Sequence, residues 1–234
     1  MLRDAIRYLG PVRPLAKRSI RFLFPHYSWL FDRLNWEARL RATVNQFPSA
    51  VKLECREDLY RYVSGTVLKG PNAAIDYLEF GVYQGGSIRQ WSSLNQNSAS
   101  RLFGFDSFEG LPEDWHSGMR KGTFSTGGKI PEIADPRVSF ISGWFQKSLR
   151  GFLGTYHPRN RIVIHVDCDL FSSTLYCLTT LDLVISPGTL IILDDFFDAL
   201  HVYRALSDYC SAYLRQYELL ACTRELGQAA IVML

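Results

Sequence analysis

Acidic side chains follow two strand-like apolar runs in this chain, residues 161–166 and 190–193. The acids are Asp167, Asp169, Asp194 and Asp195. If the two runs are neighbouring strands, about 4.8 Å apart, these carboxylates crowd into one crevice. Like charges at such a short distance repel one another unless an opposite charge compensates them, so the pattern favours a bound cation.

The segment between the two runs predicts how they are connected. Residues 172–185 have the length and spacing of a helix, and the Ser-Pro-Gly of residues 186–188 closes it. A strand, a helix and a second strand form a βαβ unit, which places both strand ends at the ligand-binding edge of a parallel sheet. Helix capping would explain one or two of the acids, but not four of them on two strands.

A glycine-rich turn precedes this unit. Residues 75–80 read as a strand and residues 88–94 as a helix, and between them lie Gly81, Gly85, Gly86 and Ser87. Such a turn presents backbone N–H groups to an anionic ligand group, although it could also be only a tight connection. Asp106 ends the next short strand, where an acid can accept hydrogen bonds from ribose hydroxyls. The dinucleotide pattern G-x-G-x-x-G is absent, which favours a nucleoside without pyrophosphate over NAD.

The remaining elements complete an α/β pattern. Residues 107–136 form a long polar loop, typical of a lid or binding loop. Residues 138–141 predict a strand that leads to Ser142 and to the aromatic Trp144, which could wall an adenine pocket or pack in the core. Residues 199–214 predict a helix. The short connection between the last two strands, residues 217–222 and 229–234, predicts an antiparallel hairpin.

Composition limits the class of protein. The 234 residues are 47% apolar, which suits one large domain with a substantial core. Five scattered cysteines without a CxxC pair argue against a disulfide framework or zinc site and favour a reducing cytoplasm. The net charge of +3 does not indicate a nucleic-acid binder, and no apolar run approaches the roughly 20 residues that span a bilayer.

The N-terminal segment differs from the rest. Residues 1–48 are basic and aromatic, and Pro11, Pro14 and Pro25 divide them into short helical pieces. We expect a helical extension that packs on its own domain or on a second copy of the chain. Contact with an acidic membrane surface is the less favoured alternative.

Three segments together resemble one family. They are residues 77–87 (YLEFGVYQGGS), 103–112 (FGFDSFEGLP) and 165–174 (HVDCDLFSST), joined by the Ser-Pro-Gly and Asp-Asp-Phe that follow. The chain from about residue 57 to 234 thus resembles the macrocin O-methyltransferase-like family of class I S-adenosylmethionine-dependent enzymes, some of which methylate sugar hydroxyls on macrolide and aminocoumarin antibiotics. The resemblance implies a Rossmann-like, doubly wound, mostly parallel seven-stranded sheet in a methyltransferase domain over residues 49–234.

The resemblance also implies roles for individual residues. Asp167, Asp194 and Asp195 match the ligands of Mg²⁺, and Asp169 matches the general base. The donor-binding matches are Glu79, Gly81, Gly85, Gly86, Ser87 and Asp106, with Ser142 and Trp144 near the adenine. The expected reaction is Mg²⁺-dependent methyl transfer from S-adenosylmethionine to a hydroxyl of a sugar or other polyol-bearing small molecule. His201 is a less favoured base, and Arg204 is expected to pair with the acids or with a substrate.

Two other functions stay open on the sequence alone. Asp167-Cys168-Asp169 is formally a D-x-D motif, which a metal-dependent glycosyltransferase would use to hold a nucleotide-sugar. The chain could also be a non-catalytic scaffold whose N-terminal segment binds a partner. The glycine turn followed by Asp106 argues against the first, and the four carboxylates argue against the second.

Overall fold

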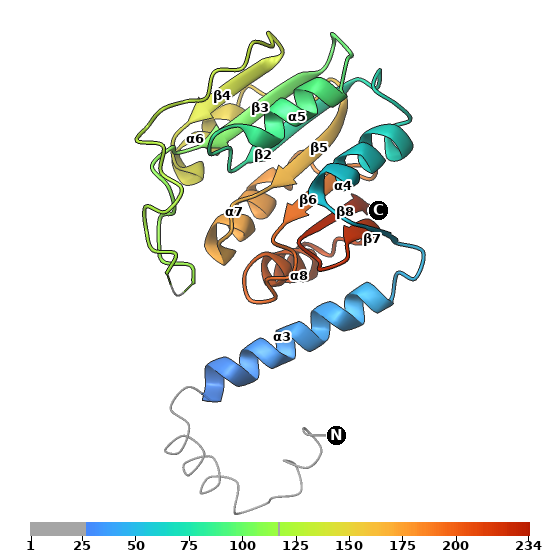
Figure 1. The fold of residues 1–234 in the computed structure, drawn as a ribbon, viewed down its shortest axis with the longest axis vertical. Helices are drawn as coiled ribbons and strands as arrows, with labels where there is room; N and C mark the ends of the chain where they lie inside the picture. The colour runs from blue at the N-terminus through green and yellow to red at the C-terminus, as the bar shows by residue number, and fades with distance from the viewer. Residues whose placement is uncertain (1–26, 117) are drawn as a thin grey trace, which may run out of the picture.

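The computed structural model describes residues 27–116 and 118–234, which form an eight-stranded sheet in the order β1-β7-β8-β6-β5-β2-β3-β4 (Figure 1). The strands are β1 (Val51–Leu53), β2 (Ile75–Phe80), β3 (Arg101–Asp106), β4 (Val138–Ser142), β5 (Arg161–Val166), β6 (Leu190–Asp194), β7 (Tyr217–Thr223) and β8 (Gln228–Met233). Strands β4, β3, β2, β5 and β6 run parallel, whereas β8 is antiparallel to both β6 and β7. The predicted α/β fold with a C-terminal hairpin is confirmed.

The sheet has one strand more than the resemblance implied. Strand β1 pairs in parallel with β7 at the edge. Its three residues are partly or fully exposed, and a segment this short shows no periodicity from which a strand can be predicted.

Helices cover both faces of the sheet (Figure 1). One face packs against α4 (Arg56–Tyr62) and α5 (Gly86–Leu94), and the other packs against α6 (Phe145–Leu153), α7 (Phe171–Leu181) and α8 (Val202–Tyr213). Alternate residues of one strand therefore enter different cores: Leu78 and Phe80 join one, and Ile75 and Tyr77 join the other. Burial on both faces explains why the central strands are almost continuously apolar.

Two helical segments differ from expectation. The amphipathic pattern of residues 57–69 predicts one helix, and the structure has α4 followed by a π-helical turn, η2 (Val63–Val67). The sequence of that turn is Val-Ser-Gly-Thr-Val, whose members are all weak helix formers, so the regular α-helix ends before it. Helix α6 was not predicted.

The N-terminal extension includes α3 (Tyr27–Asn45), a single helix of 19 residues. Pro11, Pro14 and Pro25, which were expected to break the segment, lie outside the described residues. The second half of α3 packs on its own domain: Leu40 is buried, and the Thr43 hydroxyl lies 2.7 Å from the hydroxyl of Tyr203 on α8. No described helix has the length and apolar character needed to span a membrane.

Candidate active site

A cavity of about 640 Å³ opens at the carboxyl ends of the parallel strands. Its wall includes residues that follow β2, β3, β4, β5 and β6, so it lies at the edge where open parallel sheets bind ligands. The predicted site residues that line it are Gly81, Gly86, Ser87, Asp106, Trp144, Asp167, Asp169 and Asp195. Two segments that are far apart in sequence, the glycine turn and the acidic cluster, therefore share one cavity.

The glycine turn lies directly against the acidic strand end. Gly81 has a φ of +95°, and a Cβ placed there would lie 1.7 Å from the carbonyl oxygen of Asp167. The Asp167 amide in turn donates to the carbonyl of Phe80 at 2.8 Å. Only glycine allows the two backbones to approach this closely. Gly85, with a φ of +78°, precedes α5 and packs beneath Pro131, outside the cavity lining.

Asp106 organises the turn from the end of β3. Its Oδ2 accepts hydrogen bonds from the amides of Val82 and Tyr83, both at 2.8 Å, and its Oδ1 accepts one from the amide of Phe108 at 2.7 Å. A carboxylate oxygen has more than one lone pair, so Asp106 retains capacity to accept hydrogen bonds from a ligand hydroxyl in the cavity.

Glu79 and Ser142 lie elsewhere. Ser142 is exposed at the end of β4 and is outside the cavity lining, whereas Trp144 lines the cavity. Glu79 is fully buried under the turn, where its Oε2 accepts a hydrogen bond from Tyr77 at 2.5 Å. Its Oε1 has no hydrogen-bond partner among the described residues. Contacts of Glu79 and Ser142 with S-adenosylmethionine stay predictions.

The same buried layer contains His165, which pairs in register with Glu79 across β2 and β5. His165 Nδ1 lies 2.9 Å from the Tyr77 hydroxyl, and Nε2 lies 3.2 Å from the hydroxyl of Tyr60 on α4. His165 is inaccessible to solvent, which fits a structural role better than a catalytic one.

The acidic cluster forms as predicted because β5 and β6 are adjacent. Carboxylate oxygens of Asp167, Asp169 and Asp195 lie within 4.8 Å of one another, and Asp194 is equally close to Asp167 and His165. Asp169 and Asp195 adopt positive φ values of 58° and 48°, which are uncommon for non-glycine residues and recur at functional sites.

Burial, and after it mutual repulsion, raises the pKa values of three carboxyls in the cluster. Burial, followed by the charge of Asp195, raises the pKa of Asp169 to about 8. Burial and the charge of Asp194 raise the pKa of Asp195 to about 6 and that of Asp167 well above its usual range. An all-oxygen donor set with this excess of negative charge suits a hard divalent cation such as Mg²⁺.

Arg56 also reaches the cluster, which the sequence did not predict. Its guanidinium contacts Asp194 Oδ2 and lies 4.0 Å from Asp167. Burial opposes the charge on Arg56, but Asp194 and Asp167 outweigh it, so its pKa is raised. Asp194 Oδ1 accepts further hydrogen bonds, from the Gln228 amide at 2.6 Å and from the Asp195 backbone at 3.0 Å.

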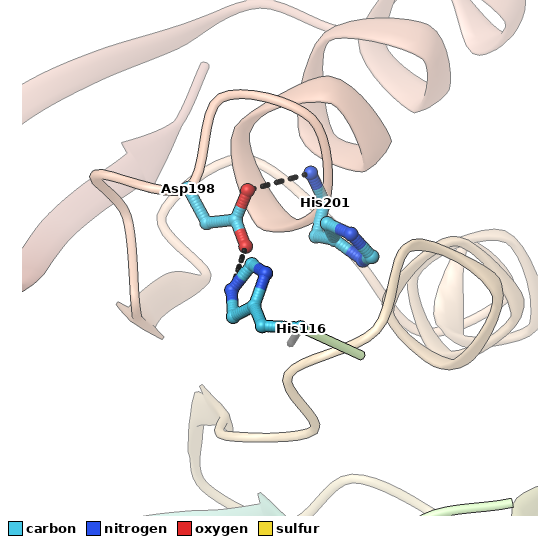
Figure 2. A group of neighbouring side chains, drawn as sticks. All are labelled: His116, Asp198 and His201. Carbon is cyan, nitrogen blue, oxygen red and sulfur yellow. Dashed lines mark hydrogen bonds and ion pairs between the residues drawn. The ribbon is translucent and has the colours of Figure 1, made fainter. Parts of the chain in front are cut away.

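The long loop between β3 and β4 lines the cavity, and Asp198 contacts it at His116 (Figure 2). Asp198 Oδ2 accepts a hydrogen bond from the Trp115 indole at 3.0 Å and lies 3.1 Å from His116 Nε2. His201 lies beside them, but it lines a second cavity rather than this one. Arg204 pairs with Asp208 at 3.5 Å and stacks on Phe171, so it does not pair with the acidic cluster; the alternative, a contact with a substrate, stays a prediction.

Comparisons with known proteins agree with this arrangement. A family profile described as a methyltransferase domain matches residues 78–196. The chain is 32% identical over 175 residues to 8-demethyl-8-(2,3-dimethoxy-alpha-L-rhamnosyl)-tetracenomycin-C 4'-O-methyltransferase of Streptomyces olivaceus, covering 64% of this chain and 65% of that protein. It is 28% identical over 165 residues to demethyldecarbamoylnovobiocin O-methyltransferase of Streptomyces niveus, covering 59% and 62% respectively.

The matched stretch thus spans less than two thirds of the length of each relative. Among solved structures, the O-methyltransferase NovP superposes with a TM-score of 0.57 at 24% identity, covering 76% of this chain and 78% of that chain. This likeness shows a shared fold.

Proposed function

The chain belongs to the methyltransferase-domain family, and we propose that it transfers a methyl group from S-adenosylmethionine to a hydroxyl of a small-molecule acceptor. The acceptor we favour carries a sugar or another polyol. Both relatives are named as O-methyltransferases, and the name of one contains a rhamnosyl group. The observation that carries the proposal is the direct packing of the glycine turn against the acidic strand end, at Gly81 and Asp167.

The donor would be held by the turn and by Asp106. Backbone amides at the start of α5 suit the carboxylate of the donor's amino-acid part, and Asp106 suits the ribose hydroxyls. Trp144 offers an aromatic surface for the adenine. S-adenosylmethionine supplies a sulfonium-bound methyl group, which an oxygen nucleophile attacks in line.

The metal ligands we propose are Asp167, Asp194 and Asp195, which present only oxygen atoms in a region of excess negative charge. When bound there, Mg²⁺ would lower the pKa of a coordinated acceptor hydroxyl. Holding donor and acceptor in one cavity would supply much of the remaining acceleration, since positioning converts a bimolecular reaction into an effectively unimolecular one.

Asp169 is the proposed general base. It lines the cavity two residues beyond Asp167, and its raised pKa of about 8 shows that its surroundings favour holding a proton. A carboxylate with elevated basicity is suited to take the proton of the acceptor hydroxyl as the methyl group arrives.

The test combines binding and turnover. Calorimetric titration should detect S-adenosylmethionine and not UDP-glucose, whereas a glycosyltransferase would bind the nucleotide-sugar and a scaffold would bind neither. With a rhamnoside as first acceptor, Asp169→Asn should retain donor binding and lose turnover at least a hundredfold. Asp194→Asn should raise the Mg²⁺ concentration needed for half-maximal rate. Unchanged turnover in both variants at saturating Mg²⁺ would refute these roles.

A further inference from the structure

A second cavity, of about 530 Å³, adjoins the first. Helix α3 provides Trp29, Arg33 and Glu37 on one side, and the segment before α8 provides residues 197–201 on the other. Trp115, His116 and Phe197 line both cavities, so these three side chains form a shared wall between them. The two cavities are therefore adjacent compartments.

The second cavity presents flat, exposed rings. Trp29 is 53% exposed and Phe197 is 50% exposed, although both belong to residue types that usually gain free energy from burial. Arg33 and Glu37, which also line this cavity, form an ion pair at 2.8 Å. The cavity thus combines aromatic rings with polar and charged side chains, and a small-molecule site uses apolar surface for contact and polar groups for orientation.

A buried carboxylate fixes the shared wall (Figure 2). Asp198 is 8% exposed, and its Oδ1 accepts hydrogen bonds from the backbone amides of Leu200 at 3.2 Å and His201 at 3.3 Å. Its Oδ2 faces the Trp115 indole and His116, as described above. Because the carboxylate holds the loop from several directions, the wall is a built feature of the fold.

The cluster of His116, Asp198 and His201 is better suited to this wall than to a metal. Their ligand atoms lie within 4.8 Å of one another. However, His201 Nδ1 already accepts the Phe171 amide at 3.2 Å, which places the proton of the neutral ring on Nε2 and leaves no lone pair for a cation. Both oxygens of Asp198 are occupied as well.

We propose that the second cavity binds the planar aromatic aglycone of a glycosidic acceptor, while its sugar lies in the first cavity above the acidic cluster. This inference rests on the proposed function, because it assigns the two parts of one acceptor to two compartments that share a wall. Trp29 and Phe197 contact the aglycone, and Asp198 acts as a positioning residue through Trp115 and His116.

The test uses three probes in the presence of S-adenosylhomocysteine: 4-methylumbelliferyl α-L-rhamnoside, methyl α-L-rhamnoside and free 4-methylumbelliferone. Calorimetry should show the aromatic glycoside binding about tenfold more tightly than the methyl glycoside, because only the aromatic glycoside can stack on Trp29 and Phe197. Trp29→Ala, which alters only the second cavity, should lower the affinity for the aromatic glycoside and for the free aglycone about tenfold. It should leave binding of the methyl glycoside and of S-adenosylhomocysteine unchanged.

Leu183→Ala is the matched control, because Leu183 is 83% exposed and lies outside both cavities. Equal affinities for the two glycosides, or aromatic binding that Trp29→Ala leaves intact, would overturn the inference. Methyl transfer to both glycosides with equal KM would also overturn it, while leaving the proposed function standing. Aromatic binding that depends on Trp29 but leads to no methyl transfer would support the aglycone site and count against the proposed reaction.

Discussion

The guanidinium of Arg56 contacts the carboxylate of Asp194, whose side chain is only 2% exposed, at the carboxyl end of β6. Arg56 comes from α4, which is far in sequence from the βαβ unit that carries the acids. The fold therefore brings a positive charge of its own to the proposed metal site. Arg56 and a divalent cation would compete for the same carboxylates.

Replacement of Arg56 should strengthen cation binding. In Arg56→Met the competing charge is lost while much of the side-chain volume remains, so we expect the affinity for Mn²⁺ to rise about tenfold, or ~1.4 kcal/mol. Isothermal titration of the donor-free protein measures this directly. Arg61→Met is the control, because Arg61 is on the same helix but pairs with Asp58 at the surface. A weaker affinity in Arg56→Met would mean that Arg56 supports the ion instead.

The raised pKa of Asp169 predicts a pH-dependent stability. Its folded-state pKa of about 8 lies above the ordinary 3.8, so its protonated form stabilises the fold at low pH, and this contribution is lost as pH rises through 8. Asp169→Asn should therefore raise Tm at pH 9 by about 2–4 °C, corresponding to ~1 kcal/mol, in the presence of EDTA. Near pH 4 the difference should vanish. An equal difference at both pH values, measured by calorimetry, would contradict this cause.

Gly81→Ala should be severely destabilising. The added Cβ would collide with the Asp167 carbonyl, so either β2 or β5 must move, and we expect a loss of more than about 3 kcal/mol in the free energy of unfolding. Gly118→Ala is a close control: Gly118 has the same φ of +95°, but its Cβ would meet no described atom within 4 Å. Urea denaturation of both variants separates the collision from the backbone strain. Similar losses in the two would show that strain alone matters.

Asp106 should control donor affinity through the turn. Asp106→Ala removes the acceptor for three backbone amides, so the turn loses its fixed shape and the affinity for S-adenosylhomocysteine should fall at least tenfold. Asp106→Asn keeps one acceptor oxygen, so its affinity for S-adenosylhomocysteine should lie between those of the wild type and Asp106→Ala. Calorimetric titration measures the series. If Asp106→Asn and the wild type bind equally, the negative charge is not required.

Local sequence patterns were sufficient for the central architecture. Residues 161–194 have strand, helix and strand lengths that leave few alternatives, and the parallel connection then brings Asp167 and Asp194 together. The short link before β8 likewise predicts the hairpin. These features depend on periodicity and connection length, which are properties of contiguous residues.

Long-range pairings could not be predicted in this way. Arg56 is one of many basic residues in the chain, and nothing in its neighbourhood indicates that it reaches Asp194. Asp198 follows the predicted acidic strand by only a few residues, yet its contact with Trp115 joins segments 83 residues apart. The resemblance placed Glu79 at the donor; in the structure its side chain lies in the buried layer, where it accepts a hydrogen bond from Tyr77, and a contact with the donor stays a prediction.

The position of Tyr60 on α4 links the surface of the site to the interior of the sheet. Arg56 and Tyr60 are four residues apart and so lie on the same side of the helix. Any shift of α4 that withdraws the guanidinium from Asp194 also displaces the phenol that meets His165, and through it the pair with Glu79. A movement of α4 would therefore change the strand tips and the polar chain inside the protein together.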